Sequence, residues 1–174
     1  MTEETEKKLF KQLTPANWLE RDTPIDIWVK IHVDGSHSRI SNDEWANQIL
    51  QYSLDESVPK EIHNLYEVAQ GAMCYGCFFY PLFTFGAEQL FRVQEAAIVH
   101  KCSQLNAPAK IKTYMSKLEW LHQNGNLADS RFSQWDSARK MRNLSSHADK
   151  QSLYGPNMAL DGLHITAELI NELW

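Results

Sequence analysis

The sequence predicts an all-α protein, a helical bundle of four to five helices that follows an irregular N-terminal extension with at most one short strand. Apolar residues recur at three- and four-residue spacing over most of the chain after residue 58. The chain has 174 residues, 43% of them hydrophobic, which is enough to bury one sizeable core. We therefore expect residues 1–58 to form an extension of unknown role and residues 59–174 to form one helical domain.

The extension contains two local patterns. Residues 25–33 alternate apolar and polar side chains, and Asp34-Gly35 follows them, which indicates a short strand that ends in a turn. Ser41 and Glu44 have the spacing of a capping box, which indicates the start of a short helix.

Five segments of the helical domain have the periodicity of amphipathic helices, and short links between them indicate a bundle. Pro81 must kink or break the path between the first two, because proline lacks the N–H that a helix interior uses. Gly125 suits the C-terminal end of a helix, and Pro156 suits a first turn. The expected helices are 59 to about 80, 82–105, 110–124, 133–144, which starts at the capping-box-like Ser133-Gln-Trp-Asp136, and 156–174.

Composition and charge narrow the function classes. A net charge of −5 argues against a protein whose whole surface attracts nucleic acid, although residues 131–150 carry five basic and two acidic side chains and leave room for a local basic face. The charged N-terminus lacks the apolar run of a signal peptide, and the most apolar stretch, 72–85, is too short to cross a bilayer. Three cysteines argue against a disulfide framework. We expect a cytoplasmic protein with no membrane contact.

A cysteine pair has the spacing of a zinc or redox site. Cys74 and Cys77 could be joined by His100 and Cys102 to complete four ligands. If one helix continued through this region, Cys77 and His100 would be on the order of 34 Å apart, and after a chain reversal they would still be about 20 Å apart. We therefore expect buried cysteines, no metal site and no cofactor.

Two further patterns concern the segment around the second helix. The aromatic run 78–85 has no basic residue nearby, so we expect it to pack in the core and not to stack on bases. Glu88, Arg92 and Glu95 share one helix face. They form either a surface stripe of ion pairs, or a face on which Glu95 points inward and orients a basic residue of a neighbouring helix.

The strongest candidate for chemistry lies at the end of the fourth helix, where Arg142 and His147 are five residues apart. Arginine can bind a phosphoryl group through two N–H donors and stabilise the charge of a pentavalent transition state. Histidine titrates near neutral pH, so it can take a proton from an attacking hydroxyl or give one to a leaving oxygen. This pair of residue types suits phosphate chemistry.

Arg142-Asn143-Leu-Ser-Ser146-His147 resembles the motif of the HEPN superfamily of helical RNases and RNA-binding domains. That motif is Arg-x(4 to 6)-His near the end of a helix, commonly with Asn, Asp or His after the Arg. The segment 88–97, with its Arg and Glu before small residues, is also similar to an earlier HEPN helix. The resemblance covers about residues 60–174 and implies a helical fold, a homodimer and a toxin or antiviral defence role in a prokaryote.

These observations lead to one main hypothesis and two alternatives. We expect a metal-independent endoribonuclease in which His147 moves protons, Arg142 stabilises the scissile phosphate and Asn143 positions the pair, with Glu95 and Ser146 in support. RNA is the expected substrate, and an antitoxin is an expected protein partner. The first alternative is a non-catalytic helical module that binds RNA or a protein, and the second is a partner of a nucleotidyltransferase.

The proton balance of the reaction predicts an assembly. One histidine would otherwise serve as both base and acid, so we expect a homodimer whose two motifs face each other and form a composite active site. On an unbroken helix five residues turn about 140°, so Arg142 and His147 would point in different directions. We therefore expect irregular helix near residues 144–148.

Overall fold

The computed structural model describes residues 10–145 and 153–174, and its architecture confirms a mostly helical bundle. Within these residues it contains six α-helices, one 3-10 helix and one two-stranded hairpin. The elements are η1 Thr23–Ile27, β1 Val29–Ile31, β2 His37–Arg39, α1 Asn42–Leu50, α2 Lys60–Tyr75, α3 Leu82–Gln104, α4 Tyr114–Gln123, α5 Asp129–Ser145 and α6 Pro156–Asn171. No helix of the described residues is long and apolar enough to span a membrane.

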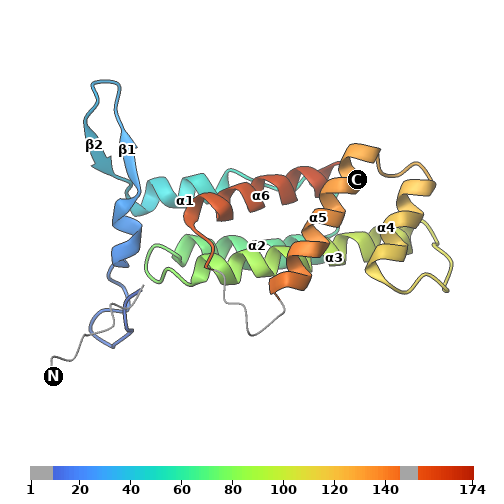
Figure 1. The fold of residues 1–174 in the computed structure, drawn as a ribbon, viewed down its shortest axis with the longest axis horizontal. Coiled ribbons are helices and arrows are strands. Elements are labelled where there is room, and N and C mark those ends of the chain that lie inside the picture. Colours follow the sequence, from blue (N-terminus) through green and yellow to red (C-terminus); the bar gives the residue numbers. More distant parts are fainter. Residues whose placement is uncertain (1–9, 146–152) are drawn as a thin grey trace.

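The long helices form the body of the molecule (Figure 1). Helices α2 and α3 form an antiparallel pair. Two contacts join them: the Gln89 side chain of α3 donates to the Leu65 carbonyl oxygen of α2, and Gly86 of α3 lies against Met73 of α2. Helices α1 and α6 pack on this hairpin. Helix α4 packs on α3, and α5 packs on both α3 and α4. The β1–β2 hairpin extends from the opposite end of the molecule (Figure 1).

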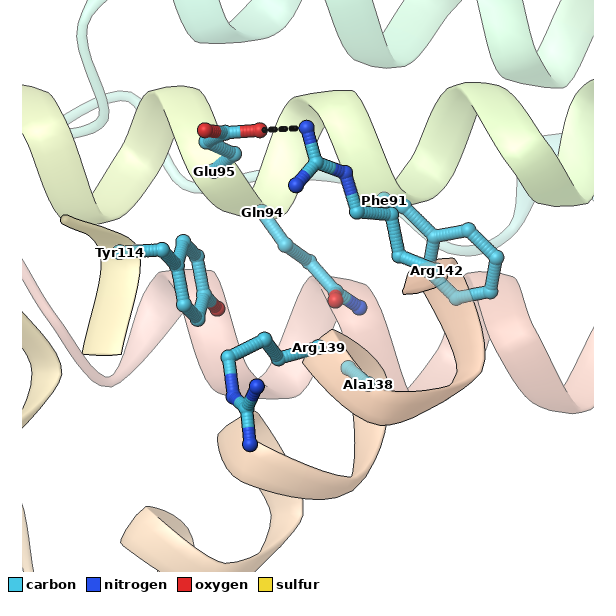
Figure 2. A pocket seen from close by; sticks show the side chains of 7 residues that line it. All are labelled: Phe91, Gln94, Glu95, Tyr114, Ala138, Arg139 and Arg142. Carbon is cyan, nitrogen blue, oxygen red and sulfur yellow. Dashed lines mark ion pairs between the residues drawn. The ribbon is translucent and has the colours of Figure 1, made fainter. Parts of the chain in front are cut away.

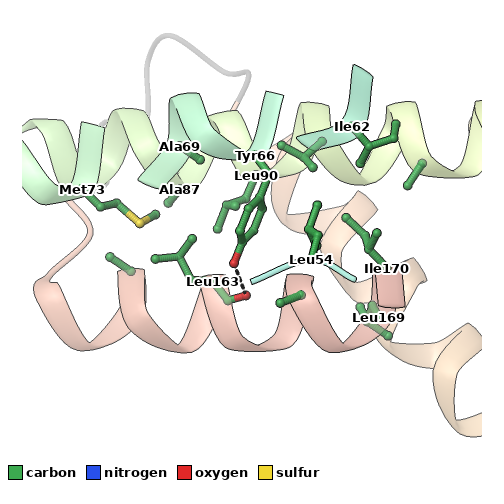
Figure 3. Packing of buried hydrophobic residues seen from close by; sticks show 14 of the residues in the cluster. Leu54, Ile62, Tyr66, Ala69, Met73, Ala87, Leu90, Leu163, Leu169 and Ile170 are labelled. Atoms are coloured by element: carbon green, nitrogen blue, oxygen red, sulfur yellow. Dashed lines mark hydrogen bonds between the residues drawn. The ribbon is translucent and has the colours of Figure 1, made fainter. Parts of the chain in front are cut away.

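The core lies between α2, α3 and α6 (Figure 3). Ile62 of α2 and Leu163 of α6 are fully buried, as the predicted helical periodicity requires. Tyr66 is buried with them, and its single hydroxyl hydrogen is shared between the carbonyl oxygens of Tyr52 at 3.1 Å and Leu163 at 3.3 Å. A buried hydroxyl without such acceptors would destabilise the fold. Desolvation raises the pKa of Tyr66, so the hydroxyl stays protonated as a donor.

The chain reverses between α2 and α3, so Pro81 marks a break and not a kink. A Cβ at Gly76 would lie 2.5 Å from the Phe83 ring, so glycine permits this tight approach. Phe83 is buried and packs edge-on against Trp45, as expected for the aromatic run. Phe85, in contrast, is 51% exposed, because it lies on the outward face of α3.

The predicted start of the fourth helix was wrong by one turn. Helix α5 begins at Asp129, and the Ser133 hydroxyl donates within the helix to the Asp129 carbonyl oxygen at 3.2 Å. Among the described residues, the Asp136 carboxylate forms no reciprocal capping-box hydrogen bond with Ser133. It accepts hydrogen bonds from Arg139 and forms an ion pair with Lys140 at 2.8 Å, one turn later. Serine and aspartate at capping-box spacing therefore lie inside this helix.

The expected strand over 25–33 is shorter than predicted and has a partner that the sequence did not indicate. Pro24 lies in the first turn of η1, and that helix takes up Ile25, which is buried in the core. Only Val29–Ile31 form a strand, which pairs antiparallel with His37–Arg39. The apolar side chains of this hairpin are exposed, because no other element of the described residues covers them.

Three predicted helix ends are confirmed. Ser41 and Glu44 form a complete capping box at the start of α1. Gly125 follows α4 with φ +73°, and the N–H groups of Gly125 and Asn126 bond to carbonyls of the last turn, at 3.0 and 2.9 Å. Pro156 occupies the first turn of α6.

Candidate functional site

The structure describes part of the predicted site. Arg142 and Asn143 lie in the last turns of α5, and both are exposed. Ser146 and His147 lie outside the described residues. Helix α5 is regular through Ser145, so the expected irregularity is not found at Leu144 and Ser145, and the remainder of that prediction falls on residues outside the description.

Glu95 and Arg142 meet across two helices (Figure 2). The Arg142 guanidinium lies 2.9 Å from the Glu95 carboxylate, and the two side chains are 46% and 39% exposed. Within the described residues Glu95 forms no ion pair with Arg92 of its own helix. The contact matches one part of the second alternative drawn from the sequence, in which Glu95 meets a basic residue of a neighbouring helix, but the 39% exposed Glu95 side chain does not point inward as that alternative required.

Tyr114 is a neighbour of this ion pair that sequence reasoning missed. It comes from the first turn of α4, and together with Arg139 it lines the same small cavity as Glu95 and Arg142 (Figure 2). Desolvation, followed by the nearby Glu95 carboxylate, raises the pKa of Tyr114, so its hydroxyl remains a neutral donor. No signal in the sequence points to Tyr114, because it is 28 residues from Arg142 and reaches it only through the packing of α4.

The cavity itself is too small for a substrate. It encloses about 10 Å³, close to the minimum for one water molecule. Any phosphate that contacts Arg142 must therefore approach from the exposed side of the guanidinium and not enter the space between α3 and α5.

Ion pairs neutralise most of the basic charge that the sequence places on and near α5. Arg131 pairs with Glu172, Arg139 with Asp136 at 2.7 Å, and Arg142 with Glu95. Hydrogen bonds from Lys140 and Arg139 lower the pKa of Asp136, so its carboxylate stays charged. Of the five basic residues in 131–150, the four that the structure describes each have a carboxylate partner. The local basic face is therefore weaker than its residue count indicates.

The cysteines lie in apolar surroundings. Cys77 and Cys102 are buried, and Cys74 is partly buried. Desolvation raises the pKa of all three thiols, which disfavours the reactive thiolate form. Within residues 10–145 and 153–174, no group of three or more His, Cys, Asp or Glu side chains could hold a metal ion.

Comparisons with protein-family models, with curated proteins and with solved structures found no match to this chain. The resemblance to HEPN proteins thus depends on the motif and on the segment 88–97 of the sequence. It remains a prediction about Arg142, Asn143 and His147, to which the structure adds the Glu95 contact.

Proposed function

We propose that this protein is a metal-independent endoribonuclease of the HEPN type. Arg142 and His147 would carry the chemistry, Asn143 would position them, and Glu95 and Ser146 would support them. The observation that carries the proposal is the 2.9 Å ion pair between Glu95 and Arg142.

This ion pair supports a positioning role because it restrains a long, flexible side chain without burying it. An arginine side chain loses substantial rotamer freedom when it is fixed, and a catalytic guanidinium benefits if that loss is already met before substrate binds. Arg142 is still 46% exposed when paired, so a phosphate can reach it. An ion pair at such exposure adds little to folding stability. We therefore interpret this ion pair by its effect on the position of Arg142 and not by its effect on stability.

The proposed reaction uses the substrate's own 2′-hydroxyl. A histidine base takes the 2′ proton while the 2′-oxygen bonds to phosphorus, the bond from phosphorus to the 5′-oxygen breaks, and a histidine acid gives a proton to that oxygen. Arg142 would stabilise the negative charge of the pentavalent phosphorus. The products would be a 2′,3′-cyclic phosphate and a 5′-hydroxyl end.

A homodimer would supply the two histidines that this proton balance favours. Leu144 is 48% exposed two residues after Arg142, and a large apolar side chain at this position suits a contact between subunits. The proposal therefore includes a composite site formed by two Arg142 and His147 pairs. A toxin or antiviral role, with an antitoxin as partner, follows from the family resemblance and belongs to the same proposal.

The direct test is incubation of the protein with mixed RNA oligonucleotides in EDTA, with DNA of the same sequences as a control. We expect RNA cleavage that leaves 2′,3′-cyclic phosphate ends, and intact DNA. Arg142→Ala and His147→Ala should each lower cleavage by about 10²-fold or more, because each removes a transition-state interaction. Arg39→Ala is the matched control and should cleave like the wild type, since Arg39 is an arginine of β2 that is 71% exposed and, like Arg142, pairs with a carboxylate.

Equal activity of the motif variants would contradict the proposed site. Equal cleavage by the wild type and both motif variants would show that the site is elsewhere.

A mixing experiment tests the composite site. Mixed Arg142→Ala and His147→Ala proteins should recover part of the activity if the site is composite. A monomer at high concentration that nevertheless cleaves RNA would exclude the dimeric version.

A non-catalytic interaction module is the second candidate, and the neutralised charge of α5 favours it. Four of the basic side chains around the motif already have carboxylate partners, which lowers the positive potential available to a polyanion. Absence of cleavage under all conditions, with retained binding of RNA or a protein, would support this candidate.

A further inference from the structure

A groove separates α5 from α6, next to the small cavity that contains Glu95 and Arg142. Both helices pack on α3, and α3 forms the floor of the groove. At one end Arg131 of α5 forms an ion pair with Glu172 of α6. From that end the two helices diverge, as Figure 1 shows, and the groove between them encloses about 480 Å³.

The groove is apolar and open to solvent. Leu90 and Phe91 of α3 line the floor, and Met141, Met158 and Ile165 line the walls. These three wall residues are 40%, 51% and 43% exposed. Single exposed apolar side chains are common on protein surfaces, but several that line one groove indicate a binding site. Methionine is frequent on such surfaces because its flexible side chain adapts to different partners.

Small residues occur among those that line the groove. Ala87, Ala138 and Gly162 come from α3, α5 and α6 respectively. A Cβ at Gly162 would lie 3.3 Å from Leu90 Cδ1, so α6 lies directly on the floor. On α6 the groove runs from Met158 to Ile165, which corresponds to roughly 10 Å, or about two helical turns.

Charge selects among the possible occupants. Asp161 is the one charged side chain among the described residues that line the groove, and it lies exposed at the rim between Met158 and Ile165. A lone carboxylate beside an apolar surface disfavours a polyanion such as RNA and favours an apolar partner that carries a cation.

We propose that this groove binds an amphipathic α-helix of a partner protein. The helix would place apolar side chains with i, i+3 or i+4, i+7 spacing over Phe91, Met158 and Ile165, and a lysine or arginine against Asp161. The bound helix would fill the space between α5 and α6 as an additional helix of the bundle. This inference does not depend on the proposed nuclease activity, because the groove is lined by Met141 and not by Arg142, although it shares Phe91, Gln94 and Ala138 with the cavity beside Glu95.

The test is a selection from a displayed library of helical peptides, with the full-length protein as target. The library fixes a helical scaffold of about 18 residues and randomises one face. We expect the selected peptides to share an apolar i, i+3 or i+4, i+7 pattern and a lysine or arginine beside it. Met158→Glu should weaken their binding at least tenfold. Val68→Glu is the matched control, since Val68 is 50% exposed on α2 and lies outside the groove.

A charge reversal makes the test specific. With Asp161→Lys as target, the same library should yield peptides that carry aspartate or glutamate at the position of the earlier cation. Selected peptides should also form photo-crosslinks to the segment that contains Met158 and Ile165. Each variant must retain the far-ultraviolet circular dichroism spectrum of the wild type before it is compared.

Several outcomes would overturn the proposal. These are a library that yields no binder, binders that tolerate Met158→Glu, or binders whose charge does not respond to Asp161→Lys. A homodimer that Met158→Glu dissociates would show that a second copy of the chain occupies the groove. An RNA oligonucleotide that protects Met158 from oxidation would assign the groove to nucleic acid.

Discussion

Helices α2, α3 and α6 bury side chains along their whole length, whereas α5 buries far fewer. Seven residues of α6 are buried. Between Asp129 and Leu144 of α5, Trp135 is the one buried residue. Ion pairs add to the contacts of α5 that the structure describes. Arg131 and Arg142 pair with Glu172 and Glu95 outside the helix, and Asp136 pairs with Arg139 within it.

The difference shows how one chain separates stability from a site. Burial of apolar area supplies most of the folding free energy, so the α2, α3 and α6 core can stabilise the molecule without much help from α5. Helix α5 can then carry exposed polar side chains and a motif of reactive residues. Sites of this kind tend to lie in less stable parts of a protein, because binding and catalysis need accessible groups.

The largest expected effect comes from removal of the buried side chain of α5. Trp135→Ala should destabilise the packing of α5 by about 3–5 kcal/mol, because a fully buried aromatic ring is lost. Hydrogen exchange should then become fast throughout α5 while α2, α3 and α6 keep their protection. Equal loss of protection in all four helices would show that α5 belongs to one cooperative unit with the core.

The same truncation in the core should act on the whole molecule. Leu163→Ala removes a fully buried side chain from the centre of α6 and should lower the free energy of unfolding by about 2–5 kcal/mol in urea denaturation. Met158→Ala on the same helix is the matched control and should change it by less than about 0.5 kcal/mol, since Met158 is 51% exposed.

A smaller effect is expected from the buried hydroxyl of the core. Tyr66→Phe removes the donor to the Tyr52 and Leu163 carbonyls and should cost about 1 kcal/mol of unfolding free energy. Tyr75→Phe, at an exposed position on the same helix, should leave stability unchanged. A neutral Tyr66→Phe variant would mean that water or neighbouring donors replace the lost bonds.

Substitution of Glu95, next to the motif, should change RNA cleavage while leaving the free energy of unfolding almost unchanged. Glu95→Gln removes the charge that holds Arg142 and should alter the free energy of unfolding by less than about 1 kcal/mol, because both side chains are well exposed. If Glu95 positions Arg142 for RNA cleavage, kcat should fall more than KM changes. Glu88→Gln, at an exposed position about two helical turns earlier on α3, is the control and should cleave like the wild type.

The smallest expected effect is a pH dependence at α1. Hydrogen bonds from the Ser41 backbone and from Lys30 lower the pKa of Glu44 from 4.5 to about 2. A carboxyl with a lowered folded-state pKa stabilises the fold above its unfolded pKa, and that contribution is lost as the pH falls from about 4.5 to about 2. The urea midpoints of wild type and Glu44→Gln should therefore differ at pH 6 and converge near pH 2. A constant difference across this range would contradict the assignment, and Glu67→Gln serves as the exposed control.

The parts of the fold that depend on local pattern could be predicted from the sequence. The helical class, an interruption at Pro81 and the helix ends at Gly125 and Pro156 each follow from periodicity or from the conformational limits of one residue, whereas only the structure shows that the chain reverses at Pro81. The start of α5 could not be predicted, because Ser133 and Asp136 satisfy a capping pattern that the helix overrides. The second strand of the hairpin was missed because its pairing depends on a partner strand and not on its own periodicity.

The sequence alone determined the residue types of the candidate site, because arginine, asparagine and histidine carry their chemistry wherever they lie. Only the tertiary structure decided which groups stand beside them. Glu95 meets Arg142 and Tyr114 lies next to both because α3, α4 and α5 pack together. The neutralised charge of α5 and the groove beside α6 likewise depend on helix packing. Such contacts join residues far apart in the chain, and their distances are set by the packing of whole helices, which no local pattern encodes.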